Sequence, residues 1–375
     1  MKRKLDSIQI LRAIAAIAVV GTHSLNRAAR AFPLQAPHSL IANFHDFYRL
    51  GEAGVDVFFV ISGFVMMYVH YDDFAVPNAP RRFIARRLTR VVPLYWALTA
   101  LAVVLLAVAP GAFFFHSRAD VPWIIGSFLF VMIAPQSGPP SPVIGQGWTL
   151  DYELFFYALF AGALLLPRRL AIPALSGAFA LLLAIGLAFP LRPSWLVPWT
   201  DPLLTEFLAG VALALAYRRA LPIFSKSVRY LVLALGFAIF LMTIWGAPPV
   251  EGWLRPLKWG IPAVLVVWGA LSMKLHDSLV VSIGKLLGDA SYSIYLFQAF
   301  ALPGLAVALK YVLKGRSIPV DLAAGILLCT AVTASVGCWY VIERPITRLL
   351  SAVLQRRDPP SRYESDRTPA LPRLD

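Results

Sequence analysis

Two polar side chains, Arg12 and His23, lie inside the apolar segment 8–25, which is long enough to cross a bilayer. An arginine at the centre of a membrane helix costs about 2.5–3.5 kcal/mol on insertion scales, so such residues usually line a polar interior or take part in chemistry. They are eleven positions apart. On a helix this spacing places the two side chains within about 20° of the same face, with a rise of about 16 Å between them. One face of this helix is therefore predicted to carry a cation near one end and a titratable base near the other.

Carboxylates and further arginines complete this pattern. Asp56, Glu153 and Glu206 each fall close to one end of a later apolar segment, and the orientation argued below places them in one outer layer with the imidazole. Arg12 lies near the cytosolic boundary instead, as does a basic cluster at 81–90. Guanidinium groups bind phosphates bidentately, so the two layers predict group transfer from a phosphate-bearing cytosolic donor to a hydroxyl-bearing external acceptor. The arginines of the cluster are Arg81, Arg82, Arg86, Arg87 and Arg90.

The composition identifies the class of protein. Of the 375 residues, 59% are hydrophobic and 14% are charged, and the mean hydropathy is +0.70. Soluble domains carry about 25% charged residues, so the sequence predicts an all-α, polytopic integral membrane protein. The net charge of +14 does not indicate nucleic-acid binding, because the basic residues form short clusters between apolar segments, as positive-inside orientation requires. Cys329 and Cys338 are nine positions apart on one predicted helix, so they face opposite ways and cannot pair.

Apolar segments of about 17–25 residues are candidate membrane spans. The first is predicted to be an uncleaved span rather than a signal peptide, because it is long and contains Arg12. A shorter segment, 121–134, precedes a Pro/Gly-rich stretch and is either a span or a re-entrant piece. Most basic residues fall on the cytosolic side only if ten segments cross, so we predict ten spans with both termini cytosolic. The ten segments are 8–28, 52–71, 91–109, 148–167, 171–190, 202–217, 228–246, 258–273, 291–313 and 320–342.

The chain divides into two regions. Residues 1–350 are predicted to form one integral membrane domain without a visible internal repeat. Residues 351–375 are polar and rich in Pro and Arg, which predicts a disordered cytosolic tail.

Taken singly, the polar motifs also have ordinary structural explanations. His23 can be a packing residue, the 81–90 cluster a positive-inside anchor, and 148–153 an interfacial aromatic belt. Ser62 lacks the strand–turn–helix setting of a nucleophile elbow. The sequence has no metal-ligand spacing, Walker loop or glycine fingerprint, so no metal is predicted.

In their order along the chain, these motifs resemble the membrane-bound acyltransferase-3 family, whose multi-pass members O-acylate bacterial surface and exported polysaccharides. Each motif is weak alone, and the order makes the match specific. The match runs from Leu11 to about Pro345, and its general pattern is nearest to members linked to exopolysaccharide production. The matching motifs are Arg12-x10-His23, Gly54-x-Asp-x-Phe-Phe-x-x-Ser-Gly-Phe64, Arg86-Arg-x-x-Arg90-x-x-Pro93-x-Tyr95, Trp148-Thr-Leu-x-x-Glu153, Glu206-Phe-x-x-Gly210 and Ser291-Tyr-Ser-x-Tyr-Leu296.

The resemblance implies an acyl-CoA donor, usually acetyl-CoA, as co-substrate. The implied acceptor is a sugar hydroxyl of a polysaccharide or lipid-linked oligosaccharide, and the implied location is the inner (plasma) membrane of a bacterium. His23 is implied as the central catalytic residue, with Arg12 in support. Family members commonly have histidine shortly after the last motif, where this chain has Gln298, so we do not expect this amide to be catalytic. The acyl chain, the acceptor sugar and the oligomeric state stay open.

These expectations combine into a predicted mechanism. Neutral His23 removes the proton of the acceptor hydroxyl while the oxygen attacks the thioester, and Glu153 or Asp56 orients the imidazole. A double displacement through acyl-His23 is equally compatible with the sequence. The donor is expected to contact Arg12, Arg86, Arg87, Arg90, Tyr95, Ser291 and Tyr292.

Two other functions stay as alternatives. A secondary transporter of a lipid-linked sugar or anion would also use intramembrane His, Asp and Glu as a proton relay. Such transporters often show two halves with interrupted helices in matching positions, and this sequence has no such symmetry. Glycosyl transfer from a polyprenyl donor usually needs a catalytic acid in a large external loop, and the candidate loop 110–147 holds only Asp120 as an acid.

Overall fold

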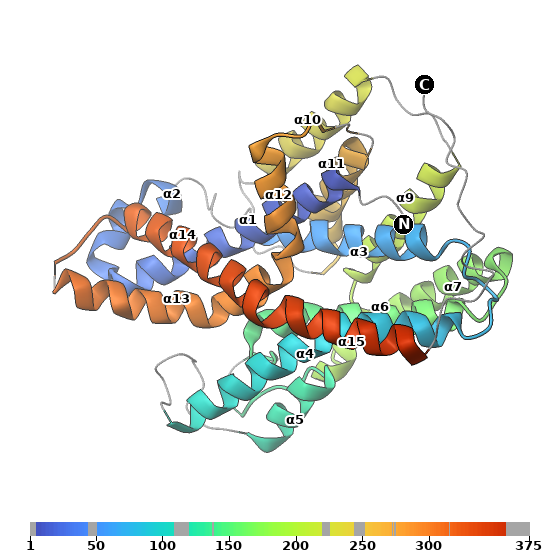
Figure 1. Cartoon of the computed structure of the whole chain (residues 1–375), viewed down its shortest axis with the longest axis horizontal. Helices are drawn as coiled ribbons and strands as arrows, with labels where there is room; N and C mark the ends of the chain where they lie inside the picture. Colours follow the sequence, from blue (N-terminus) through green and yellow to red (C-terminus); the bar gives the residue numbers. More distant parts are fainter. Residues whose placement is uncertain are drawn as a thin grey trace.

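The computed structural model describes residues 5–43, 51–108, 120–136, 139–219, 226–243, 252–271, 273, 275–314 and 316–357. Within these ranges the chain forms helices and no strands, which confirms the predicted all-α polytopic fold (Figure 1). The longer helices are α1 (Asp6–Ala31), α3 (Gly54–His70), α4 (Ala79–Val108), α5 (Val121–Leu129), α6 (Trp148–Ala163), α7 (Arg168–Ala188), α9 (Leu204–Arg218), α10 (Lys226–Met242), α11 (Ile261–Leu271), α12 (Leu279–Asp289), α13 (Ser291–Leu313), α14 (Val320–Cys338) and α15 (Arg344–Arg357). The short elements are η1 (Pro33–His38), α2 (Leu40–Asn43), η3 (Gly145–Gly147), η4 (Ser194–Leu196), α8 (Val197–Thr200), η5 (Pro256–Gly260) and η6 (Trp339–Glu343).

The apolar helices coincide with the predicted spans. Seven helical stretches of the described chain are long and apolar enough to cross a membrane. Two shorter apolar helices, at Ser227–Met242 and Pro256–Leu271, and the 16-residue α6 occupy the other three predicted positions. Each of the ten predicted segments therefore contains an apolar helix, while the number of crossings and the cytosolic placement of the termini stay predictions.

The short segment after α4 does not form a span. Its helix, α5, has nine residues, or about 14 Å, against a hydrocarbon core of about 30 Å. The chain turns back at Phe130, whose φ is 57°. Helix α6 then runs parallel to α3, because Trp148 lies beside Phe59 and, farther along both helices, Glu153 accepts a hydrogen bond from Ser62. Parallel α3 and α6 agree with one crossing between them, at α4, as the ten-span prediction has it.

Three helices near the centre of the molecule are short, although α3 and α9 each continue a longer helical stretch, Gly51–His70 and Ser194–Arg218. Helices α3, α6 and α9 have 17, 16 and 15 residues, or about 22–26 Å. Gly51, just before α3, packs against Ala18 and Thr22 of α1, and nine further residues of α1 extend beyond this contact. Thr149 in the first turn of α6 meets Tyr295, which is only one turn into the 23-residue α13. In the predicted orientation, the C-terminal ends of α1 and α13 are the outer ends. Helices α3 and α6 therefore begin well below the outer ends of these two neighbours.

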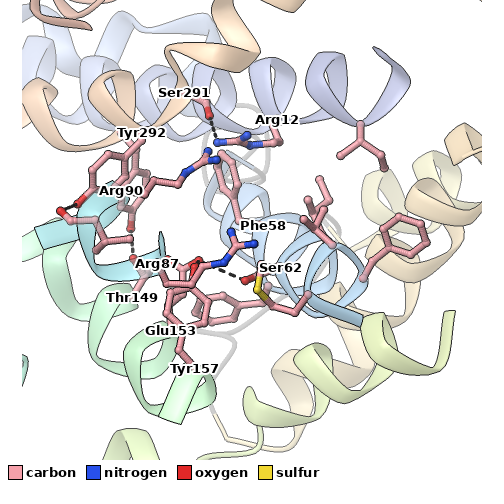
Figure 2. A pocket seen from close by; sticks show the side chains of 18 of the residues that line it. Arg12, Phe58, Ser62, Arg87, Arg90, Thr149, Glu153, Tyr157, Ser291 and Tyr292 are labelled. Carbon is pink, nitrogen blue, oxygen red and sulfur yellow. Dashed lines mark hydrogen bonds between the residues drawn. The ribbon is translucent and has the colours of Figure 1, made fainter. Parts of the chain in front are cut away.

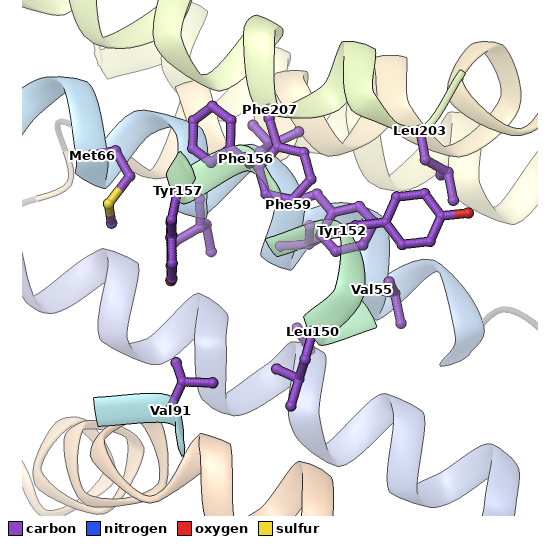
Figure 3. Packing of buried hydrophobic residues seen from close by; sticks show 14 of the residues in the cluster. Val55, Phe59, Met66, Val91, Leu150, Tyr152, Phe156, Tyr157, Leu203 and Phe207 are labelled. Atoms are coloured by element: carbon purple, nitrogen blue, oxygen red, sulfur yellow. The ribbon is translucent and has the colours of Figure 1, made fainter. Parts of the chain in front are cut away.

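Close packing joins α3, α6 and α9 into one unit. A Cβ atom on Gly63 of α3 would lie 2.0 Å from the carbonyl oxygen of Phe207 in α9, and Gly210 packs as closely against α3. Such small residues let helix backbones approach each other in membranes. Beside this crossing, Phe59 and Phe156 each stack on Phe207 with ring centroids 4.6 Å apart (Figure 3). The aromatic stack holds the three short helices in register.

Two helices extend beyond their predicted limits. Helix α4 begins at Ala79, so the 81–90 cluster forms its first turns instead of a loop before the span. Helices α14, η6 and α15 follow one another without a break from Val320 to Arg357 and form the long red helix of Figure 1. Residues 351–357, the first part of the predicted disordered tail, are thus helical, and 358–375 lie outside the described residues.

Candidate active site

A cavity of about 300 Å³ lies between α1, α3, α4, α6 and α13 (Figure 2). Apolar side chains of α1 and α3 form much of its wall, and charged and hydroxyl groups form the remainder. Six of the predicted site residues meet here, although they come from four separate helices. These six are Arg12, Arg87, Arg90, Glu153, Ser291 and Tyr292.

Arg12 is held in the cavity by contacts within α1 and with α13. Its Nη2 donates a hydrogen bond to Ser291 Oγ at 2.9 Å, and its Nη1 donates to Gln9 Oε1 at 3.2 Å (Figure 2 shows the first). Gly288, just before α13, packs against the backbone of Gln9, which brings the start of α13 close to α1. The guanidinium group therefore has polar partners inside the membrane domain, as a buried arginine requires.

Helix α4 presents two further arginines to the cavity. Arg87 and Arg90 are three positions apart and share a helix face, whereas Arg86 is exposed and does not line the cavity. The guanidinium carbon of Arg87 lies 5.7 Å from the ring centre of Phe83 and 5.9 Å from that of Tyr157. Its buried Nε has no hydrogen-bond partner in the described part of the chain. Arg87 thus brings a guanidinium group to the cavity wall while its Nε lacks a hydrogen-bond partner among the described residues.

Glu153 is the only acidic residue among the described residues that line the cavity. Its Oε1 accepts hydrogen bonds from Ser62 Oγ, at 3.2 Å, and from the hydroxyl of Tyr157. The carboxylate also interacts electrostatically with Arg12 and Arg87. The sequence argument put Glu153 in the outer layer because it assumed that its helix starts at the outer boundary, and the deeper start of α6 brings it to the arginines instead. Three guanidinium groups against one carboxylate leave the cavity positive, which suits a phosphate-bearing ligand.

Two tyrosines of α13 reach the cavity. The hydroxyl of Tyr292 donates to the carbonyl oxygen of Val91 at 2.6 Å. The hydroxyl of Tyr295 lies 3.2 Å from Thr149 Oγ1. Tyr95, which the motifs also place at the donor site, is fully buried in the core and is not among the cavity-lining residues.

His23 lies on α1 beyond the cavity. Its side chain is half-buried and does not line the cavity. Among the described residues no carboxylate hydrogen-bonds the imidazole, so neither of the two predicted orienting acids contacts it there. Gly54 packs against Val19, which is one turn before His23, and Val55 next to it lines the cavity. On α1 itself, the last residue that lines the cavity is Arg12, eleven positions or about 16 Å along the axis before His23.

Asp56 belongs to a second polar cluster outside the cavity lining. Its fully buried carboxylate accepts hydrogen bonds from Nε and Nη2 of Arg255, at 3.2 and 3.0 Å, and Glu206 interacts electrostatically with both. The guanidinium carbon of Arg255 lies 5.6 and 5.2 Å from the ring centres of Trp148 and Trp259. Arg255 is not among the predicted site residues, although its place on the predicted outer side, against the positive-inside trend, was a usable signal.

Similarity to known proteins agrees with this architecture. The chain matches the acyltransferase-3 family, described as an acyltransferase domain, over residues 5–344. It is 36% identical over 306 residues to the exopolysaccharide production protein ExoZ of Rhizobium meliloti (strain 1021), which covers 80% of this chain and 91% of ExoZ. It is 30% identical over 338 residues to the putative membrane-bound transacylase BcsY of Komagataeibacter xylinus, covering 82% of this chain and 79% of BcsY.

A third relative covers almost the whole length of both proteins. The acyltransferase MdmB of Streptomyces mycarofaciens is 24% identical over 410 residues, with 99% of this chain and 98% of MdmB aligned. No solved structure shows a significant match. The match over nearly all of the membrane domain confirms the resemblance that the motifs indicated, and the chain belongs to the acyltransferase-3 family of membrane acyltransferases.

Proposed function

We propose that this protein transfers an acyl group, in the simplest case acetyl, from cytosolic acyl-CoA to a hydroxyl group of an exported carbohydrate. The observation that carries the proposal is the cavity, in which Arg12, Arg87 and Arg90 gather around a single carboxylate inside a membrane domain. The family supplies acyl transfer as the reaction class. The similarity to ExoZ, an exopolysaccharide production protein, supports an exopolysaccharide as the class of acceptor.

The lining of the cavity suits the two parts of an acyl-CoA donor. Phosphate groups would bind the guanidinium groups, each of which can donate two hydrogen bonds to one phosphate. The uncharged arm that carries the thioester would lie along apolar side chains of α3, such as Ile61 and Val65. Leu5 and Tyr68, at the cytosolic ends of α1 and α3 in the predicted orientation, would border the entrance. The nucleotide end would thus remain at the cytosolic face while the thioester reaches the interior.

His23 is our proposed base for the transfer. The acceptor oxygen forms a bond to the thioester carbon, and the hydroxyl proton passes to the imidazole. The C–S bond then breaks, and the CoA thiolate leaves with a proton returned by the imidazolium. A positioned base typically contributes about 10²–10⁴-fold to such a step. The location of His23 on α1, between the cavity and the predicted outer side of the membrane, supports a meeting point between an internal thioester and an external acceptor.

The transfer itself can be tested in membranes. Membranes that contain the protein would be incubated with acetyl-CoA labelled in the acetyl group, and label would be followed into the isolated surface carbohydrate. We expect label in the carbohydrate, released by mild alkali as an O-ester should be, and no incorporation with membranes that lack the protein. If no acyl-CoA, from acetyl to succinyl, labels any carbohydrate above this background, the proposed function is wrong.

The role of His23 has a matched control in the same chain. His23→Ala should lose transfer by about 10²-fold or more while the protein still inserts into the membrane. His38→Ala changes an exposed histidine of η1 and should leave transfer unchanged. Transfer by the His23→Ala protein at the rate of the unchanged protein would rule out the proposed base.

Direct transfer and double displacement can be separated without an acceptor. Purified protein would be mixed with labelled acetyl-CoA alone and then denatured. Label that stays on the protein, and that is absent from the His23→Ala protein, would indicate an acyl-His23 intermediate. Rapid transfer with no labelled protein at any time would indicate direct attack by the acceptor.

A further inference from the structure

Two hydroxyl groups lie side by side in the cavity wall, and the proposed mechanism gives neither of them a role. Thr149 Oγ1 and the hydroxyl of Tyr295 are 3.2 Å apart, and both residues line the cavity. Both are buried, with 5% and 7% of their surface exposed. They join the first turn of α6 to the second turn of α13.

The pair lies away from the entrance proposed above at Leu5 and Tyr68. Thr149 and Val55 belong to the first turns of α6 and α3, whereas Leu5 and Tyr68 lie at the other ends of the helices that form the wall. Phe58 packs edge-on against Tyr295, with ring centroids 6.2 Å apart, and fixes its ring. A donor whose phosphates stay at the arginines therefore brings its thioester toward this pair.

The hydrogen atoms of the pair permit two arrangements. Thr149 also lies 3.3 Å from the carbonyl oxygen of Gln146, so its single hydrogen can go either there or to Tyr295. If Thr149 donates to Gln146, the tyrosine hydrogen goes to Thr149. If Thr149 donates to Tyr295, the tyrosine hydrogen is left to point into the cavity. An acceptor atom in the cavity, such as a thioester carbonyl oxygen, makes the second arrangement favourable.

We propose that Tyr295 is a catalytic residue that donates a hydrogen bond to the carbonyl oxygen of the donor thioester, with Thr149 orienting its hydroxyl. This inference rests on the proposed function. When the acceptor oxygen bonds to the thioester carbon, the carbonyl electron pair moves to the oxygen, which becomes negatively charged in the tetrahedral intermediate. The hydroxyl of Tyr295 stabilises this charge until the C–S bond breaks, the C=O bond re-forms and CoA leaves. Hydrogen-bond donors aimed at such an oxygen are among the largest contributions to acyl transfer.

The critical test is Tyr295→Phe, which removes one oxygen atom and keeps the ring that packs against Phe58. We expect kcat for acetyl transfer to fall by about 10²-fold, since removal of one such donor typically costs about 10²–10³-fold. The KM for acetyl-CoA and the dissociation constant of unacylated CoA, which has no carbonyl at this position, should change by less than about threefold. Tyr311→Phe, the same change at an exposed position of α13, is the control and should leave all these values unchanged.

Variants of Thr149 separate orientation from simple packing. Thr149→Ser keeps the hydroxyl and should retain most of kcat, whereas Thr149→Val keeps the shape and should lower kcat by about tenfold with CoA binding intact. Unchanged kcat in Tyr295→Phe would overturn the inference. Loss of CoA binding in proportion to kcat, or equal effects of the Ser and Val substitutions, would also overturn it and assign the pair a structural role. Failure of the unchanged protein to label any carbohydrate is a different result and counts against the proposed function itself.

Discussion

Arg87 and Arg90 extend from one face of α4 into the cavity, where their charge exceeds that of the single carboxylate. If phosphate groups of the donor bind there, removal of one guanidinium loses charge-assisted hydrogen bonds worth about 1.5–3 kcal/mol. Arg90→Gln should therefore raise the KM for acyl-CoA by about tenfold or more, with a smaller effect on kcat. Arg81→Gln, an exposed arginine at the start of the same helix, is the control. Steady-state kinetics with equal KM values for the two variants would contradict a donor site at Arg90.

The buried ion pair between Asp56 and Arg255 is expected to stabilise the fold, so its removal is tested by thermal stability rather than by kinetics. Removal of one partner from a buried ion pair leaves an uncompensated charge and costs about 3–5 kcal/mol. Arg255→Gln should therefore markedly lower the thermal stability of the detergent-solubilised protein. Adding Asp56→Asn should recover part of the loss, since the buried charge is then gone. The reverse result, in which the double variant is less stable than Arg255→Gln, would contradict this account of the pair.

At the crossing of α3 and α9, backbone contact leaves no space for a side chain. Gly63→Ala would place a methyl group 2.0 Å from the carbonyl oxygen of Phe207 and force the helices apart. Overpacking of this kind costs about 1–3 kcal/mol, so the melting temperature should fall. Gly177→Ala in α7, where no atom lies within 4 Å of the added Cβ, should leave it unchanged or slightly raise it. A melting curve in which both substitutions behave alike would contradict the close crossing.

The positions of the apolar helices could be predicted from the sequence, but the depth at which each helix begins could not. Runs of apolar residues predicted the positions of the ten apolar helices, because a membrane span requires them. The depth at which each helix begins leaves no such pattern, since it depends on packing against neighbours such as Gly51 on Ala18. For that reason six of the residues that line the cavity were among the predicted site residues, while the grouping of Glu153 with the arginines rather than with His23 was not predicted. The amphipathic α12 and the early start of α4 were likewise missed, because polar faces conceal short or extended helices in a hydropathy count.

For the molecule as a whole, the directions of packed helices bear on its topology in the membrane. Tyr68 contacts Tyr217 near one end of α3 and α9, and Asp56 lies beside Glu206 near the other, so the two helices run parallel. Helices α3 and α9 occupy the second and sixth predicted spans. Their parallel packing agrees with ten apolar helices that cross the membrane in alternating directions. Reporter fusions at Pro140 and Arg219 should therefore report opposite sides, with Pro140 outside and Arg219 in the cytosol. Activity of both reporters on the same side would contradict ten spans.

The shortness of α3 and α6 bears on a problem that any enzyme of this kind faces. A nucleotide thioester carries several negative charges and cannot enter hydrocarbon, while the polymer to be decorated lies beyond it. In the predicted orientation α3 and α6 begin below the outer ends of α1 and α13, which would leave a layer thinner than the surrounding lipid between the proposed donor and its acceptor. With the donor proposed here, only a small neutral group would have to pass the remaining gap, and the charged carrier would never leave its own compartment. The cell would then not need to export acyl-CoA. Only the acyl group would cross, and the free energy of thioester cleavage would drive the transfer.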